Sequence, residues 1–334
     1  MKKKYFFIGL ILLLVALLGY HFFAASEAER QIDKTIQEQT AKSDSISVQY
    51  SSVEVAPFSG KISFSDLTVI FKDHIQRAQQ LIFDIGYIDF LNIYFGGLAY
   101  GLDHLDQANI TLRQPSYLNQ QSLYEVKMDT LQILYQGNAL DAILAMAKDT
   151  ALAIDHSVKA HSSRLTLRFP ETLISGIVAR NFSYSGMISE GKNSYWKGAI
   201  HQFSTDSLIW RPSESFQNTY RFFIQGFGYQ SDAIPFQSLR FYSEPVSQKD
   251  TLHVKTRLQS ELAQFLAKGF INLNKPIGSS ELNNMEIKIS ELSTAFERVL
   301  QNVEQLLSIS LPSDSTGIVL EVTGTLGNPR LSTQ

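Results

Sequence analysis

Alternation of apolar and polar residues along short segments constrains this sequence more than any other feature. Ile46, Val48 and Tyr50 alternate with polar neighbours, and the same period of two returns along most of the chain. Successive side chains of a β-strand point to opposite faces, so this period predicts strands with one buried face. Glycine and proline between the segments are typical of the turns that connect antiparallel strands.

The predicted strands cover most of the chain beyond residue 43. The 22 Phe and 14 Tyr residues support this assignment, because aromatic residues favour strands and half-buried surfaces. After Ser65 and Asp66 the apolar set resumes with the same period at Leu67. Strands are predicted around residues 46–50, 53–55, 62–71, 81–85, 109–115, 165–167, 182–184, 195–203, 220–229, 239–241, 270–273, 285–289 and 318–322.

Two segments have helical spacing instead, at residues 138–154 and 292–307. In the first, Leu140, Leu144 and Ala147 fall on one face, which predicts an amphipathic helix. In the second, Thr294 and Glu297 have the spacing of a capping box. We expect both helices to pack against the sheet. The alternative is that they cover an apolar groove.

The N-terminus predicts a transmembrane anchor at residues 1–26. Residues 5–25 carry no formal charge and are long enough to cross the ~30 Å hydrocarbon core. The preceding lysines predict a cytoplasmic N-terminus by the positive-inside rule. A cleaved signal peptide ending near residues 24–26 is the alternative. The residues expected to form and border the anchor are Lys2, Lys3, Lys4, Tyr5, Phe6, Phe7, Tyr20, Phe22 and Phe23.

Beyond the anchor, residues 27–43 are polar and compatible with a short helical stalk, and residues 44–334 are expected to form one β-rich domain. The formal net charge of −3 and the absence of a basic run outside the first four residues argue against nucleic-acid binding. The chain has no cysteine, which excludes disulfides and thiolate chemistry.

Candidate chemical groups are sparse. Asp103, His104 and Asp106 offer three metal donors within four residues, but no second histidine-rich element stands out as a partner. His156 and Ser157 are two ingredients of a nucleophilic triad, yet adjacent residues rarely face one another. Phosphate-binding glycine loops and zinc-protease motifs are absent from the sequence. We therefore expect no enzymatic activity, no cofactor and no metal.

Several segments resemble the AsmA-like proteins of bacterial envelopes, which are relatives of TamB. The anchor leads into the segment FSGKISFSDLTV at residues 58–69, followed by the long stretch 84–98 and by ITLRQP at residues 110–115. Near the C-terminus, GTLGNP at residues 324–329 matches a turn on which strands of that family often close. The resemblance implies an elongated, twisted antiparallel sheet curled into a groove, and a role in phospholipid movement and outer-membrane assembly.

The expected protein is therefore anchored by a single span in a bacterial inner membrane, with its body in the periplasm. It would bind membrane lipid through acyl chains along an apolar β-groove and contribute to envelope homeostasis. A closed sheet core is the alternative reading of the same residues, and a non-enzymatic scaffold that pairs with other envelope proteins is the alternative function. The residues expected to line the groove are Val48, Ile62, Phe64, Val69, Phe83, Ile85, Phe182, Tyr184, Phe222 and Ile224.

Overall fold

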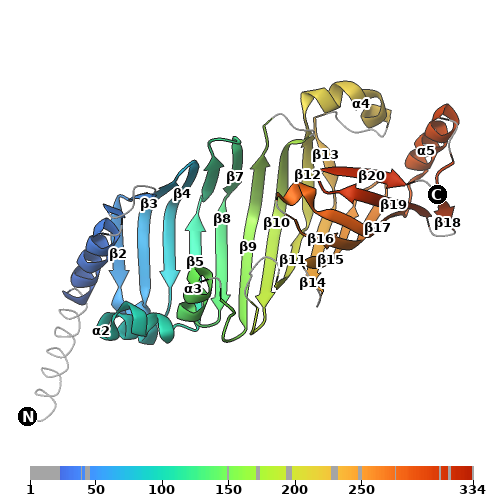
Figure 1. Ribbon diagram of the computed structural model, residues 1–334. Helices are drawn as coiled ribbons and strands as arrows, with labels where there is room; N and C mark the ends of the chain where they lie inside the picture. Colours follow the sequence, from blue (N-terminus) through green and yellow to red (C-terminus); the bar gives the residue numbers. More distant parts are fainter. Residues whose placement is uncertain are drawn as a thin grey trace, which may run out of the picture.

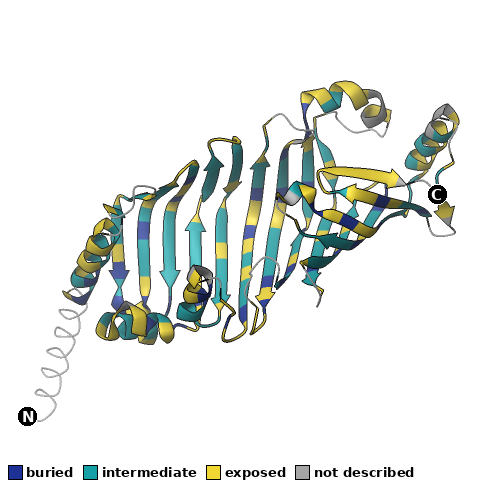
Figure 2. Ribbon diagram, viewed as in Figure 1, coloured by how far each residue is buried: buried dark blue, intermediate teal, exposed yellow. Residues whose placement is uncertain are grey.

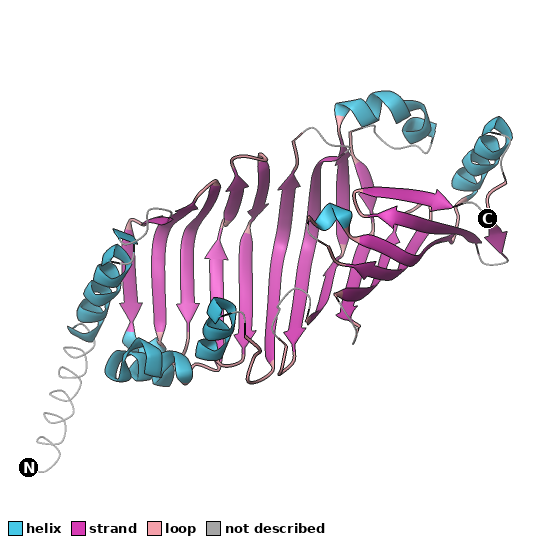
Figure 3. Ribbon diagram, viewed as in Figure 1, coloured by secondary structure: helices cyan, strands magenta, loops and turns pink. Residues whose placement is uncertain are grey.

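The structure of the chain is a computed structural model. It describes residues 23–38, 40–41, 46–148, 150–170, 174–192, 198–226, 232–246, 250–274, 276–307, 310–314 and 317–332. Within these ranges, most residues lie in strands of one sheet, and helices lie at its margins (Figure 3).

Twenty strands form a single sheet in which every pairing is antiparallel. The first ten are β1 (Ile46–Gln49), β2 (Ser52–Ala56), β3 (Lys61–Phe71), β4 (His74–Asp84), β5 (Gln107–Arg113), β6 (Ser116–Asn119), β7 (Tyr124–Met128), β8 (Thr130–Gln136), β9 (His156–Arg168) and β10 (Ile174–Ile188). The others are β11 (Ala199–Thr205), β12 (Ser207–Pro212), β13 (Ile234–Phe236), β14 (Ser238–Pro245), β15 (Thr251–Gln259), β16 (Gln264–Asn272), β17 (Glu281–Ser290), β18 (Ser313–Asp314), β19 (Gly317–Thr325) and β20 (Asn328–Ser332).

The strands follow one another across the sheet nearly in chain order. Strands β1 and β2 pair with β3 at one end, and β19 pairs with β20 at the other (Figure 1). Among the described strands, no pairing joins these two ends, so the sheet is an open band. The prediction of a mostly β chain with a large antiparallel sheet is confirmed.

The helices are α2 (Tyr87–Asp103), α3 (Ala139–Lys148), α4 (Glu214–Gly226) and α5 (Thr294–Leu307), with short 3-10 turns at η1 (Pro57–Ser59) and η2 (Ile277–Ser279). A further helix covers residues 23–38 and is called the N-terminal helix below. It includes most of the predicted stalk.

The register of the strands aligns one apolar residue from each of many strands. Directly opposed residues of an antiparallel pair share a face, so these residues form a continuous line across one face of the sheet. We call this line the apolar row and its side of the sheet the apolar face. Its members are Val55, Ile62, Phe83, Ile110, Ile133, Ala160, Tyr184, Phe203, Phe241, Thr256, Ala267, Ile287 and Leu320.

A line of backbone irregularities crosses the same sheet. Asp66 in β3, Gln114 after β5 and Asn181 in β10 have φ near +50°, and the breaks between β7 and β8 and between β11 and β12 lie at the same level. An inserted left-handed residue shifts the alternation of side chains by one. Phe64 and Leu67 therefore both lie on the apolar face, although they are three residues apart.

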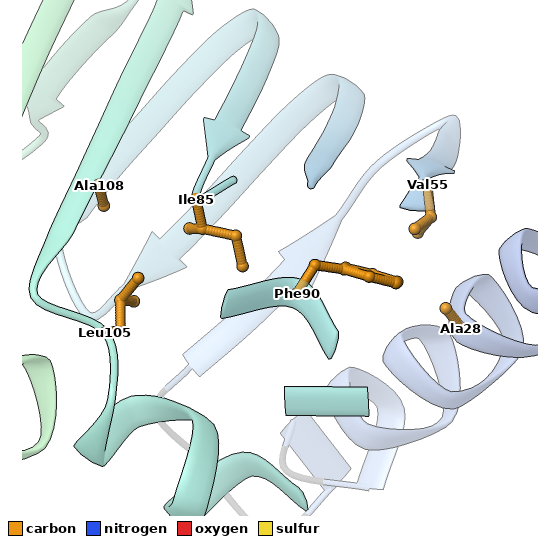
Figure 4. Close-up of a cluster of buried hydrophobic side chains, with 6 residues drawn as sticks. All are labelled: Ala28, Val55, Ile85, Phe90, Leu105 and Ala108. Carbon is orange, nitrogen blue, oxygen red and sulfur yellow. The ribbon is translucent and has the colours of Figure 1, made fainter. Parts of the chain in front are cut away.

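The main hydrophobic cluster joins two helices to one end of the apolar face. Phe90 of α2 packs with Ala28 of the N-terminal helix and with Val55 of β2, as Figure 4 shows. Ile85 and Leu105, which flank α2, complete the buried contacts. The backbone N–H of Val55 also donates to the Glu29 carboxylate at 3.0 Å. The N-terminal helix is thus docked on the sheet rather than standing free as a stalk.

The other helices also contact the apolar face. Ala145 of α3 packs with Ile188 and Ala199. Trp210 of β12 meets Phe216 of α4 edge-on at 4.9 Å between ring centroids, and Phe265 of β16 meets Phe296 of α5 at 6.3 Å. These contacts leave the middle of the apolar face to half-buried residues, and Figure 2 shows mainly intermediate burial across the central strands.

Helices α3 and α5 confirm the helices predicted at 138–154 and 292–307, although α5 is capped by Ser293 rather than by Thr294, since the Ser293 Oγ accepts from the Phe296 N–H at 3.3 Å. The strand predicted at 220–229 is wrong over residues 220–226, which belong to α4. There the Ser213 hydroxyl caps the helix, accepting from the Phe216 N–H at 3.3 Å, and places Phe216 against Trp210. The sequence analysis also did not predict α2.

Candidate functional site

The middle of the apolar face is the candidate functional site. Ile62 and Phe83, both predicted groove residues, are direct partners within the apolar row. Tyr184 is a member of the same row, and Phe182 lies two residues before it on β10. The structure thus brings together residues that are more than 100 positions apart in the sequence.

An aromatic ladder occupies the centre of this site. Phe203 stacks on Phe241 of the neighbouring strand with 4.7 Å between ring centroids and 17° between planes. Phe182 lies 6.4 Å from Phe203 on the other side. All three rings are half-buried, and Phe241 also packs against the buried cluster of Val254, Leu282, Met285 and Val322. Cross-strand aromatic pairs stabilise the sheet and present a broad apolar surface.

Beyond the line of irregularities, the apolar face is hollowed to a volume of about 200 Å³. The predicted groove residue Val69 lines this hollow, together with Leu112 and Leu131 from the two sides of the irregularity. Val48 is the register partner of Val69 on β1 and so lies on the same face. Apart from a few polar atoms, this lining offers only van der Waals contact to a guest.

A smaller hollow of about 110 Å³ lies next to Tyr184 and His201. The Tyr184 hydroxyl and the His201 Nδ1 are 2.8 Å apart and share a hydrogen bond. Burial of the ring raises the pKa of Tyr184, so the phenol stays protonated at neutral pH. A hydrogen-bonded polar pair thus borders the otherwise apolar surface, and the Tyr184 phenol adds no charge to it.

Four of the predicted groove residues have a different place. Phe64 and Ile85 are each 8% exposed and belong to the packed interior, because the Tyr50 ring packs on Phe64 and α2 packs on Ile85. Phe222 and Ile224 belong to α4 rather than to a strand, so their spacing of two does not place them on the apolar face. The alternation of three residues could not distinguish exposed groove positions from packed interior positions or from helical positions.

A further hollow lies on the opposite side, which we call the polar face. It measures about 1100 Å³ and runs over β5, β8 to β11, β14 and β15. Its β15 lining is Lys255 and Arg257, without Thr256 of the apolar row between them. Alternation therefore assigns the hollow to the polar face. This hollow was not predicted from the sequence, because its cations come from three strands, of which β9 is distant along the chain from β14 and β15.

A buried polar cluster joins α3 to the sheet. The His156 Nε2 lies 3.0 Å from an Asp141 carboxylate oxygen, and its Nδ1 lies 2.7 Å from the Tyr135 hydroxyl. Ser157, the other suspected triad residue, donates instead to Gln136 at 3.3 Å and points to the opposite face. His156 and Ser157 therefore do not act on one another, and the cluster serves to fasten α3.

This cluster gives an expected acid sensitivity. Burial acts to raise the pKa of Asp141, but hydrogen bonds from His156 and from the Ala153 and Ile154 N–H groups outweigh it, so the pKa is lowered. A lowered pKa stabilises the fold above the unfolded-state pKa of about 4, and this contribution is lost as pH falls through the folded value. We expect Asp141→Asn to cost about 1–2 kcal/mol at pH 7 in urea unfolding.

The cost of Asp141→Asn should shrink as the wild type is titrated below pH 4. The control is Asp103→Asn, which removes the same charge from an exposed residue whose backbone carbonyl, rather than its carboxylate, accepts a hydrogen bond from Asn138. Equal unfolding midpoints for the two variants at pH 7 would show that the cluster does not stabilise the fold.

Other predicted features are placed as follows. Within the described residues no group of three or more potential metal ligands occurs, and the His104 Nδ1 is instead 2.9 Å from the Tyr100 carbonyl oxygen. Phe23 is 69% exposed on the N-terminal helix. The remaining anchor residues, from Lys2 to Phe22, lie outside the described residues. In the part of the chain that is described, no helix has the length and apolarity needed to cross a membrane.

Comparison with known proteins yields no match to a family model, to a curated protein or to a solved structure.

Proposed function

We propose that this protein is an AsmA-like envelope protein that binds phospholipid acyl chains along the apolar face and helps to move them. It would be held in the bacterial inner membrane by residues 1–26, with the sheet in the periplasm. The observation that supports this proposal best is the apolar row, which runs from β2 to β19. The row contains no charged residue, and Thr256 is its only member outside the aliphatic and aromatic types.

The apolar row supports lipid binding through the hydrophobic effect. Each methylene group removed from water contributes about 0.8 kcal/mol, so partial shielding of two acyl chains is worth many kcal/mol. The row also crosses the strands instead of ending at a pocket wall, so an acyl chain can lie along its central part, between the docked N-terminal helix at Val55 and the buried cluster around Val254 and Met285. In this proposal the sheet curls around the row into a groove.

Photo-crosslinking at neighbouring positions on opposite faces tests the proposal. A photoreactive phenylalanine analogue is placed at Phe203 on the apolar face, or at Gln202 on the polar face of the same strand. We expect phospholipid adducts, identified by mass spectrometry after irradiation in cells, at position 203 and at least tenfold fewer at 202. The large difference follows because only an acyl chain on the apolar face lies within reach of the probe.

Two further positions complete the design. Ile133 on the apolar face and Gln132 beside it should repeat the same contrast on β8. Capture of lipid at all four positions would indicate nonspecific detergent-like contact. Capture at none would remove the lipid proposal while leaving the membrane tether untouched.

A second candidate function is a scaffold that pairs with another envelope protein through a sheet edge. The observation that favours it is β20, which ends the sheet and pairs only with β19 among the described strands. Leu331 on this strand is 64% exposed. A strand of a partner could add to this edge through backbone hydrogen bonds. Protein adducts at Leu331, with no lipid adducts at Phe203, would favour this function.

A further inference from the structure

The hollow of the polar face carries a concentration of positive charge, and we call it the basic trough. Its lining includes Lys159 of β9, Arg240 of β14, and Lys255 and Arg257 of β15, and it contains no aspartate or glutamate. The chain as a whole has a net charge of −3. These four cations are distant from one another or interspersed with other residues in the sequence, and the fold places them on one surface of an acidic protein.

The cations of the trough are not neutralised from nearby. Within the described part of the chain, none of the four makes an ion pair or a side-chain hydrogen bond. Two carboxylates on adjoining positions have other partners, since Glu286 lies 3.2 Å from Lys268, and Glu244 lies 3.0 Å from His253. An anion entering the trough would therefore meet unsatisfied positive charge.

Two of these cations oppose one another directly. Arg240 and Arg257 are register partners on β14 and β15, and like charges at such positions destabilise a sheet. Lys255 is two residues from Arg257 and shares its face. Guanidinium groups bind phosphate through two parallel hydrogen bonds, and a bound phosphate would relieve the repulsion between them.

The rest of the trough is rich in neutral hydrogen-bonding groups. Ser183, Ser185 and Ser204 contribute hydroxyls, and Gln132 and Gln202 contribute amides. Hydroxyl and amide groups both donate and accept hydrogen bonds, which suits a ligand with many hydroxyl groups.

Aromatic platforms for stacked bases are scarce in the same place. The rings on the polar face of the trough are His161 and Tyr242, and both have polar partners, since the His161 Nδ1 lies 3.2 Å from the Ser183 hydroxyl and the Tyr242 hydroxyl donates to Glu244 at 2.7 Å. Phe203 and Phe241 border the trough through their backbone, because their rings lie on the apolar face. Single-stranded nucleic acid is normally held by such rings in addition to cations. The lining therefore favours a saccharide over a nucleic acid.

We propose that the basic trough binds a soluble, multiply phosphorylated carbohydrate, with phosphate groups on Arg240, Arg257 and Lys255 and sugar hydroxyls on the central serines and amides. The ligand is a soluble molecule because a lipid-borne headgroup would have to lay its acyl chains on a polar surface. This site is separate from the lipid site, since the two lie on opposite faces of the sheet.

Calorimetric titration of the full-length protein in detergent with inositol hexakisphosphate tests this proposal, with myo-inositol as the neutral comparison. We expect binding of the phosphorylated compound only, weakening as salt is raised. Arg240→Gln and Arg257→Gln should each weaken binding about tenfold, the effect of losing one charge-assisted interaction. Lys255→Gln should weaken it by a smaller factor.

The matched control is Arg113→Gln, which removes an exposed arginine on β5 outside the trough. It lies about five strand spacings, or ~24 Å, from β14, well beyond the screening length of ~8 Å. We expect binding within about twofold of the wild type.

Thermal unfolding shows whether a weakened variant is folded. Relief of the like-charge pair should keep the midpoints of Arg240→Gln and Arg257→Gln at or above that of the wild type. The proposal fails if inositol hexakisphosphate and myo-inositol bind alike, if Arg113→Gln weakens binding as much as Arg240→Gln does, or if only phosphatidylglycerol vesicles are bound.

Discussion

Replacing Phe90 with alanine is expected to destabilise the protein by about 3–5 kcal/mol, the range measured for removal of a buried phenylalanine. The ring is 4% exposed and lies between the N-terminal helix and the end of the sheet (Figure 4). Its removal would leave a cavity lined by Val55, Ile85 and Leu105. Chemical unfolding followed by circular dichroism measures the loss.

The control for this variant lies five residues further along the same helix. Phe95 is 70% exposed and contacts Tyr94 at 5.0 Å between ring centroids. Phe95→Ala removes the same atoms at a solvated position, so we expect a cost below about 1 kcal/mol. Similar costs for the two variants would mean that α2 is not packed on the sheet.

Replacing Gly60 with alanine is expected to cost about 3 kcal/mol, because no side chain fits at this turn. A Cβ atom there would lie 2.0 Å from the carbonyl oxygen of Gly86, which is backbone and cannot rotate away. The Gly60 carbonyl also accepts from the Ile85 N–H at 3.1 Å. The turn after η1 is thus held against the start of α2, and an added methyl group would separate them.

Gly191→Ala provides the comparison for backbone strain alone. Gly191 has a φ of +77°, and an added Cβ would have no neighbour within 4 Å. Its replacement should cost about 1 kcal/mol, the usual penalty for a positive φ. The difference between the two variants in urea unfolding measures the steric part. If Gly60→Ala were as mild as Gly191→Ala, the contact between the turn and Gly86 would not be close in solution.

The apolar alternation predicted strand positions well because the period of two is local. Leu67 and Val69 were placed on a strand from their spacing, and the structure puts both on the apolar face. The helix at α3 was predicted for the same reason, since its apolar residues recur every three or four positions. Such patterns depend only on backbone geometry within one element.

Helix α4 shows where local patterns fail. Tyr220, Phe222 and Ile224 alternate as a strand would, yet Ser213 caps a helix that carries Phe216 to Trp210. The contact between Trp210 and Phe216 joins a strand to a helix, and the spacing of apolar residues within one segment does not reveal it. The burial of Phe64 and Ile85 could not be predicted for a similar reason, because the alternation of apolar residues does not indicate which other elements pack on them.

By itself the sequence determined many of the strands and, between the irregularities, which of their residues share a side, because the alternation of side chains is a property of each strand. Only the tertiary structure decided which residues become neighbours across strands. The register joins Phe203 to Phe241 on one face and Arg240 to Arg257 on the other. Both candidate sites depend on these pairings, which long-range hydrogen bonding sets and which no single segment encodes.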